Sequence, residues 1–378
     1  MDEGVVARRT LYPGVDSSDF SHADLERAGR YHRPLYLTSG IGLALSCGVY
    51  SLLAWSRIGD RLWDAVAGLG WAGSAAAWAA LVVAAAELVR LPLAVWRGFV
   101  WERRFGFSTQ TLASWTVDRA KAFTIALVLT AGAWTAAVAL SRALPGWWAA
   151  PAAAALAMAA LVISFLGPVV LEPLFNRFSP LADSRLVGEL RALAAAAGVP
   201  VRDVLVADAS RRTTKVNAYV SGLGATRRVV LFDTLLASAD EREVKLIVAH
   251  ELGHRRDRHA AKATALAMLG GAVAVLVLWA VLGTLLPRDF PLALLLFIGL
   301  QFAGMPIFAA ISRRMERAAD RFSLELTHDL EAFERAHVEL ARKNLSELDP
   351  PRLAYLLMFT HPTPPERLAF GRAWAATS

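Results

Sequence analysis

Two histidines and a glutamate lie close together in the segment H-E-L-G-H, which runs from His250 to His254. The histidines are four residues apart, so on an α-helix of about 3.6 residues per turn both imidazoles lie on one face and can reach a single cation. Glu251 flanks the same face without having to bind the ion itself. Two neutral nitrogen ligands and a carboxylate that can take a proton from water are what a zinc hydrolase requires. The alternative is an exposed helix with two surface histidines, because the pattern fixes only three residues.

This helix is predicted to begin near Ala239. Ser238, with Glu241 three residues later, has the spacing of a capping box. The apolar residues that follow recur at helical spacing, at Val244, Ile247, Val248 and Leu252.

A metal site of this kind needs a third protein ligand, and the neighbouring sequence does not supply one. His259 falls one residue short of the last histidine in the longer pattern H-E-x-x-H-x-x-G-x-x-H, and Asp257 replaces the glycine of that pattern. Farther along, Glu316 and Asp320 are four apart on a predicted polar helix and share a face. Glu316 is therefore a candidate ligand. Asp320 could accept the free ring N–H of a metal-bound histidine.

Other interpretations of these residues stay open. Glu316 and Asp320 could instead make surface salt bridges with the arginines around them. Glu325 and His328 are further ligand candidates, less well placed. Near the C-terminus, His361 and Arg367 could donate hydrogen bonds to an oxyanion that develops on a scissile carbonyl, which spacing alone does not establish.

The chain has 378 residues, 56% of them hydrophobic, and a positive mean hydropathy. Six apolar runs are each long enough to cross about 30 Å of hydrocarbon at about 1.5 Å per residue. They are Leu35–Trp55, Leu69–Val95, Ala122–Leu140, Trp147–Leu171, Ala263–Leu286 and Pro291–Ile311. This number of runs favours a polytopic membrane protein over a soluble protein with buried helices. Glu87 and Arg90, one turn apart in the second run, either line a polar cavity or snorkel to the membrane surface.

Arginine and lysine residues predict the orientation. They are concentrated before the first run and between the second and third, whereas the other short loops carry only Arg57, Arg61, Arg142 and Arg288. The positive-inside rule then places both termini and the segment 172–261 in the cytoplasm. The net charge of +7 follows from this asymmetry. No basic and aromatic groove pattern accompanies it, so nucleic acid is not an expected partner.

The ends and the cysteine content narrow the class further. The start, Met1-Asp2-Glu3, is acidic, so we expect no cleavable signal peptide and insertion through the first apolar run. Cys47 is the only cysteine and lies within that run, which excludes disulfides and thiolate metal ligands.

The segment 172–261 is predicted to hold a small sheet beside the catalytic helix. A helix is expected over Ser184–Ala197, and β-prone runs follow at Val204–Val206, Val216–Val220 and Arg228–Phe232, with Gly222 and Gly224 as a hairpin loop between the last two. An edge strand over Asn217–Ser221, including Ala218 and Tyr219, could pair with an extended substrate peptide through its main chain. It could equally be an ordinary scaffold hairpin.

The predicted fold is therefore predominantly α-helical, with about six transmembrane helices and a cytoplasmic catalytic domain that carries a small β-sheet. We expect an N-terminal cytoplasmic segment at 1–33 and four membrane helices within 34–171, joined by a cytoplasmic amphipathic loop at 96–121. The catalytic domain would comprise 172–261 and 312–378, on either side of a membrane helix pair at 262–311.

Taken together, the motifs resemble those of the type I CAAX prenyl endopeptidases, integral-membrane zinc metallopeptidases of the gluzincin type. The resemblance covers nearly the whole chain in the family's order, with F-V-W-E-R-R-F-G-F-S-T-Q-T, P-L-F-N-R-F-S-P-L, N-A-Y-V-S-G-L-G, H-E-L-G-H, S-R-R-M-E-R-A-A-D and H-P-T-P-P-E-R. It implies a zincin-like catalytic domain and a helical barrel around a water-filled intramembrane chamber, with the active site at its cytoplasmic end. Eukaryotic members have seven spans, and the first has no counterpart within residues 1–33.

Carried onto matching positions, the resemblance implies one Zn²⁺ bound by His250, His254 and Glu316, with Glu251 as general base. Asp320 would support a ligating histidine, Asn217 and its neighbours Ala218 and Tyr219 would form the substrate-binding edge strand, and His361 with Arg367 would lie near the transition state.

The function expected on these grounds is peptide-bond hydrolysis in a lipid bilayer. The substrate is expected to be a peptide or protein, and a prenylated C-terminal peptide is one candidate. Two alternatives use the same architecture. One is a quality-control protease resembling the membrane heat-shock metallopeptidases, and the other is a non-catalytic scaffold or transporter.

Overall fold

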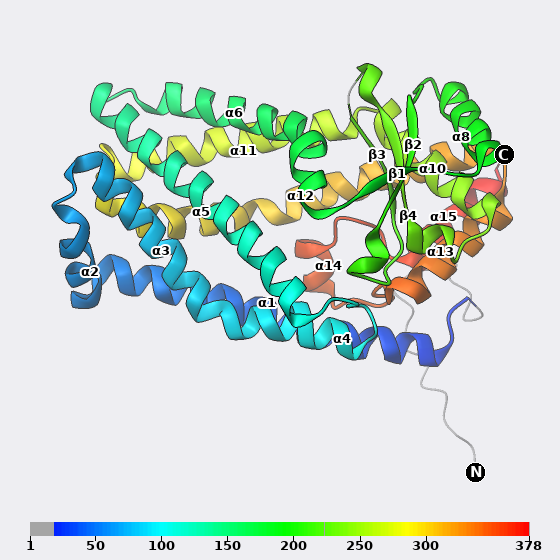
Figure 1. Cartoon of the computed structure of the whole chain (residues 1–378), viewed down its shortest axis with the longest axis horizontal. Coiled ribbons are helices and arrows are strands. Elements are labelled where there is room, and N and C mark those ends of the chain that lie inside the picture. Colours follow the sequence, from blue (N-terminus) through cyan, green and yellow to red (C-terminus); the bar gives the residue numbers. More distant parts are fainter. Residues whose placement is uncertain (1–18, 223, 378) are drawn as a thin grey trace, which may run out of the picture.

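Six long apolar helices run side by side along the longest axis of the molecule (Figure 1). The structure, a computed structural model, describes residues 19–222 and 224–377, so residues 1–18 of the expected N-terminal segment lie outside the described residues. The helices are α1 (His22–Trp55), α3 (Gly70–Val95), α5 (Leu112–Ala143), α6 (Ala149–Leu166), α11 (His259–Leu282) and α12 (Phe290–Thr327). They confirm the six expected spans.

The surface of these helices suits a lipid environment. Large apolar side chains such as Leu88, Val128 and Ile307 are 70%, 64% and 62% exposed. In water so much exposed apolar surface on one bundle would be costly, whereas hydrocarbon chains solvate it readily.

Two of the helices extend well beyond their apolar runs. Helix α1 begins at His22 after a capping box of Ser21 and Asp24 and passes through Pro34 without ending, so it includes the last part of the expected N-terminal segment 1–33. Helix α12 continues through Thr327, so Glu316 and Asp320 lie on the same helix as the sixth span. The short helix α2 (Arg57–Ala67) connects α1 to α3.

The amphipathic segment expected between the second and third spans is not one element. Helix α3 continues through a π-helical turn (Trp96–Trp101) and α4 (Glu102–Arg104), and α5 begins at Leu112. The loop between them pairs with the catalytic part of the chain: Thr109 N–H donates to the Arg212 carbonyl (3.2 Å) and Thr214 N–H to the Phe107 carbonyl (3.0 Å). The segment thus joins the apolar helices to the segment 172–261.

Three buried tryptophans hold the turn between α11 and α12. The indole N–H groups of Trp78, Trp134 and Trp148 donate to the carbonyls of Arg288 (3.1 Å), Pro287 (3.1 Å) and Gly283 (2.8 Å). These tryptophans come from α3, from α5 and from the residue before α6, so three parts of the bundle fix where α12 begins.

A four-stranded sheet lies at one end of the bundle (Figure 1). Its strands are β1 (Phe178–Pro180), β2 (Asp203–Ala207), β3 (Ala218–Ser221) and β4 (Arg228–Phe232), in the order β1-β2-β4-β3. Strands β2 and β4 are parallel and the other two pairs are antiparallel. The three expected strands and the β3–β4 hairpin are confirmed. Strand β1 was not predicted, because it is only three residues long and contains Pro180, which is unfavourable within a strand.

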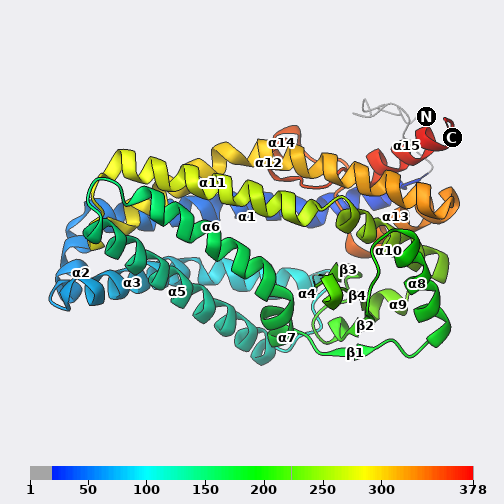
Figure 2. The same cartoon turned by 90° about the horizontal axis from the view of Figure 1, so that it is seen from above.

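The sheet shares its core with two helices, α8 (Ser184–Ala196) and α10 (Glu241–Arg256). Short helices α7 (Glu172–Phe175) and α9 (Asp233–Leu236) precede β1 and follow β4. Of the C-terminal helices, α14 (Arg352–Met358) lies beside the middle of α12 (Figure 2). Helices α13 (Leu330–Asn344) and α15 (Pro364–Ala375) lie near the C-terminal end of α12 and beside α10.

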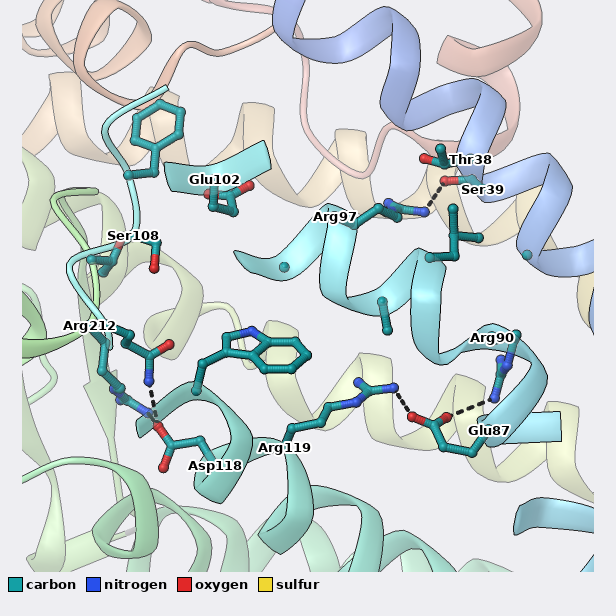
Figure 3. A pocket seen from close by; sticks show the side chains of 18 of the residues that line it. Thr38, Ser39, Glu87, Arg90, Arg97, Glu102, Ser108, Asp118, Arg119 and Arg212 are labelled. Carbon is teal, nitrogen blue, oxygen red and sulfur yellow. Dashed lines mark hydrogen bonds and ion pairs between the residues drawn. The ribbon is translucent and has the colours of Figure 1, made fainter. Parts of the chain in front are cut away.

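A cavity of ≈ 1200 Å³ lies among α1, α3, α5 and α12 and reaches the catalytic part of the chain. Glu87 and Arg90 line it, as one of the two interpretations of this pair predicted (Figure 3).

Candidate metal centre and active site

Helix α10 carries the H-E-x-x-H segment, and it begins later than expected. Asp240, not Ser238, is the N-cap: its side chain accepts from Glu243 N–H (2.9 Å), and Glu243 accepts from Asp240 N–H (3.1 Å). The Ser238 hydroxyl instead donates to the Thr234 carbonyl (2.8 Å). Ser238 thus contacts the preceding short helix α9, and the capping box forms between Asp240 and Glu243, two residues later than expected.

His250, His254 and Glu316 converge on one point. His250 Nε2 and His254 Nε2 are 3.1 Å apart. His250 Nε2 lies 3.4 Å from Glu316 Oε2, and His254 Nε2 lies 3.3 Å from Glu316 Oε1. One ligand atom from each residue lies within 4.8 Å of the others, and this is the one such group among the described residues. Glu325 and His328 do not belong to it.

The convergence depends on a close approach of α10 and α12 at Gly253. A Cβ atom on Gly253 would lie 2.9 Å from Phe322 Cδ1 and 3.2 Å from Ala319 Cα, both on α12. Only glycine lets the two helices come this close. The sequence analysis did not single out this residue, although a glycine inside a helical pattern signals close packing.

The surroundings of Glu316 fit a bound cation. The residue is 5% exposed, and its Oε2 atom has no hydrogen-bond partner among the described residues. A buried carboxylate without such a partner is costly unless a positive charge faces it. Two imidazole nitrogens and one carboxylate are a common ligand set of catalytic zinc.

Each of these two imidazoles has a partner for its other nitrogen. His250 Nδ1 lies 2.9 Å from Asp320 Oδ1, and His254 Nδ1 lies 2.8 Å from His259 Nδ1. Such contacts fix the tautomer and the orientation of a ligating ring. The expected contact of Asp320 is therefore present, whereas the position of His259 was predicted only to be unsuited for a ligand.

Asp320 is fully buried behind the three converging side chains and forms an ion pair with Arg367. Arg367 Nε donates to Asp320 Oδ2 (2.9 Å), and the guanidinium also bonds Oδ1. His337, on α13, lies beside Asp320 with Nε2 3.8 Å from Oδ1. The sequence analysis did not single out His337. The available signal was its spacing, since it follows Phe333 by one turn and shares the buried face.

A second cavity, of ≈ 730 Å³, brings most of the candidate residues together. It is lined by nine of the ten: His250, Glu251, His254, Glu316, Asn217, Ala218, Tyr219, His361 and Arg367. Asp320 is the tenth and lies behind them. His361 Nε2 is 3.3 Å from Glu316 Oε1.

Burial and charge shift the acid–base properties of this cavity. Burial raises the pKa of the Glu251 carboxyl above its ordinary value, which favours proton exchange nearer neutral pH. Burial alone would lower the pKa of His250, but the carboxylates of Asp320 and Glu316 raise it to about 9. Burial, together with the nearby Arg367, lowers the pKa of His337 to about 3 and keeps that ring neutral.

Strand β3 forms an edge of the sheet, and its register shows which groups point outward. Phe232 N–H donates to the Asn217 carbonyl (3.0 Å), so Asn217, Tyr219 and Ser221 direct their main-chain groups toward β4. The main-chain groups of Ala218 and Val220 therefore point to the free edge. Asn217 itself lies one residue before β3.

Side chains occupy both ends of this edge. At one end, the Asn344 side-chain amide accepts from the Val216 N–H (3.0 Å) and donates to the Val216 carbonyl (3.1 Å). At the other end, Arg255 Nε donates to the Val220 carbonyl (2.8 Å). The Ala218 N–H donates a hydrogen bond to the side-chain oxygen of Asn217 (2.9 Å). In the described part of the chain this leaves the Ala218 carbonyl and the Val220 N–H to pair with a peptide. Arg255 and Asn344 gave no sequence signal, because their partners are main-chain atoms.

Comparisons with known proteins match both halves of the chain. Residues 180–375 match the model of peptidase family M48, and residues 6–177 match a model described as CAAX prenyl protease N-terminal, five membrane helices. An uncharacterized metalloprotease of Bacillus subtilis is 34% identical over 74% of this chain and 69% of its own length.

The relatives include proteins with an assigned activity. CAAX prenyl protease 1 of Saccharomyces cerevisiae is 28% identical over 76% of this chain and 70% of its own length. A crystal structure of S. mikatae Ste24p has a TM-score of 0.80 and 26% identity, and the match covers 96% of this chain and 92% of that one.

Proposed function

Because the chain belongs to peptidase family M48 and is a membrane metallopeptidase of the CAAX prenyl protease kind, we propose that it hydrolyses peptide bonds with one Zn²⁺ held by His250, His254 and Glu316. The observation that carries this proposal is the convergence of these three side chains, within 4.8 Å of one another, in the cavity that also contains Glu251.

The residues of the cavity divide the work of hydrolysis. When bound, zinc supplies Lewis acidity, which polarises a carbonyl oxygen and makes water acidic enough to lose a proton near neutral pH. Glu251 takes that proton and later gives it to the leaving amine, and its raised pKa suits both transfers. Asp320 and His259 hold the two ligating imidazoles in orientation. His361 and Arg367 line the same cavity and donate hydrogen bonds to the developing oxyanion.

The free edge of β3 orients the substrate. An extended peptide that bonds the Ala218 carbonyl and the Val220 N–H lies along the cavity wall beside Glu251. The similarity to CAAX prenyl protease 1 supports a prenylated C-terminal peptide as the substrate class. The distribution of arginine and lysine supports a site and termini on the cytoplasmic side.

A cleavage assay tests this function. Purified protein in detergent is given a farnesylated C-terminal CAAX peptide, its unprenylated counterpart and an unfolded membrane protein. We expect preferential cleavage of the farnesylated peptide and loss of cleavage with a chelator. Preferential cleavage of the unfolded protein would instead support the quality-control alternative.

Glu251→Gln is expected to lower kcat about 100-fold to 10,000-fold, because it removes the general base, while zinc content stays unchanged. The matched control is Glu241→Gln, in the first turn of the same helix and outside the cavity. A Glu251→Gln variant as active as wild type would contradict the assignment.

A further inference from the structure

The larger cavity has a charged wall that the proposed hydrolysis does not use (Figure 3). Its cationic lining residues are Arg90, Arg97, Arg119, Arg212 and Lys215, and its acidic ones are Glu87, Glu102 and Asp118. Five cations and three carboxylates leave an excess of two positive charges.

The contacts show where the excess lies. Lys215 Nζ is 2.8 Å from Glu102, and Arg212 is 3.9 Å from Asp118. Glu87 is shared, since it pairs with Arg90 at 3.3 Å and also with Arg119.

Arg97 has no carboxylate within ion-pair distance among the described residues, and its NH1 atom donates to the neutral Ser39 hydroxyl at 2.9 Å. Its charge is one of the two that lack a counter-ion. The wall also holds two buried polar atoms, Arg119 Nε and Ser108 Oγ, for which the described residues provide no hydrogen-bond partner. An uncompensated cation and unpaired polar atoms on one cavity wall are the complement of an anionic ligand.

Consecutive residues of the chain connect this wall to the active-site cavity. Lys215 lines the larger cavity, and the next residues, Val216 and Asn217, line the smaller one. A peptide bound at the β3 edge therefore has one end directed toward this wall.

The direction of β3 indicates which end. Strand β3 runs from Ala218 to Ser221, away from Lys215. A peptide in the more stable antiparallel pairing runs the opposite way, so its C-terminal side leads toward Lys215. The Asn344 amide already bonds Val216, so the ladder stops there and the peptide leaves the edge beside the cavity.

We propose that the cationic wall of the larger cavity, with Arg97 as its uncompensated charge, binds the free α-carboxylate at the C-terminal end of the peptide substrate. This rests on the proposed function. An α-carboxylate is an anion that a peptide chain carries whatever its sequence, and arginine binds carboxylates with charge-assisted hydrogen bonds. The larger cavity thereby favours peptides whose free C-terminal carboxylate lies close to the bond that is cut.

Matched peptides test the proposal. One peptide sequence is prepared as the free C-terminal acid and as the C-terminal amide, and KM and kcat are measured for both in wild type, Arg97→Gln and Arg103→Gln. Arg103 is the matched control because it is close to Arg97 in the chain but does not line the cavity; it lies over the Phe99 ring.

For wild type and for Arg103→Gln, we expect kcat/KM to be about tenfold to 100-fold higher for the acid than for the amide, mainly through KM. In Arg97→Gln, kcat/KM for the acid should fall toward the value for the amide, and kcat/KM for the amide should equal that of wild type.

Equal cleavage of acid and amide by wild type would overturn the inference and leave the proposed function standing. A loss in Arg97→Gln that is the same for both peptides, and that depends on anionic lipid, would overturn it in favour of a lipid headgroup. If wild type cleaves neither peptide, the proposed function fails, and the inference with it.

Discussion

His250 illustrates how single residues prepare this site for a metal ion. The carboxylates of Asp320 and Glu316 that orient its ring also hold a proton on it, with a pKa of about 9. At neutral pH the metal-free site therefore carries a proton that an incoming cation must displace. Metal affinity and acidity are coupled through this one imidazole.

The apparent zinc affinity should consequently depend steeply on pH. Below the raised pKa of about 9, His250 is protonated in the metal-free protein, so each unit of acidification should weaken zinc binding about tenfold. The dependence should disappear above that pKa. Competition with a chromophoric chelator between pH 6 and pH 8 measures it.

The variant Asp320→Asn should flatten this profile, because it removes one of the two carboxylates that hold the proton. A thermal melt checks that the variant is folded. A wild-type affinity that is constant from pH 6 to pH 8 would refute the coupling.

At the scale of elements, the site depends on the packing of α10 against α12. Two of the three proposed ligands come from α10 and the third from α12, so the distance between these helices sets the size of the site. Gly253 lies at a close approach of the two helices, one residue before His254.

Gly253→Ala is expected to separate the helices and weaken zinc binding. The added methyl group would overlap Phe322 and the Ala319 main chain, and overpacking of this kind costs about 1–3 kcal/mol of unfolding free energy. Thermal unfolding and zinc titration measure the two effects. Gly188→Ala is the control, since a Cβ on that α8 glycine meets nothing within 4 Å and alanine favours helix. Two variants with the same stability and affinity would contradict the role of Gly253.

Periodicity and spacing were enough to predict the six spans, three of the four strands and the shared face of His250 and His254. Glu316 was one of several candidates from spacing, and only the resemblance to a family singled it out. Long apolar runs and the i, i+4 histidines are local patterns, which a sequence displays directly. The contacts of His259, His337, Arg255 and Asn344 were not predictable. Each of these side chains contacts its partner through a ring nitrogen or bonds a main-chain atom. The residue types in the sequence therefore do not reveal which residue the partner is. The start of α10 was misplaced because two capping boxes overlapped and only tertiary structure selects between them.

At the scale of the whole molecule, α12 links the membrane region to the active site. The three tryptophans hold the turn that leads into α12 at one end of the bundle, and Glu316 lies about 39 Å from the first residue of α12, at about 1.5 Å per residue. One continuous helix therefore places a proposed metal ligand at a set depth relative to the bilayer.

The proposed cytoplasmic orientation can be tested by labelling. In a Cys47→Ser background, Ser184→Cys reports on the catalytic domain and Asp64→Cys on the loop between the first two spans, and both positions are exposed. A membrane-impermeant maleimide should label only Asp64→Cys in intact cells and only Ser184→Cys in inverted vesicles. The reverse pattern would contradict the charge-based prediction.

The partly occupied edge of β3 also bears on aggregation of the protein. A bare strand at the border of a sheet invites the strands of other molecules and promotes aggregation. Asn344 and Arg255 take up main-chain groups at both ends of this strand, so a foreign segment finds too few partners to form a lasting ladder. The same feature means that backbone pairing alone retains a substrate only briefly, and products can leave readily once the bond is cut.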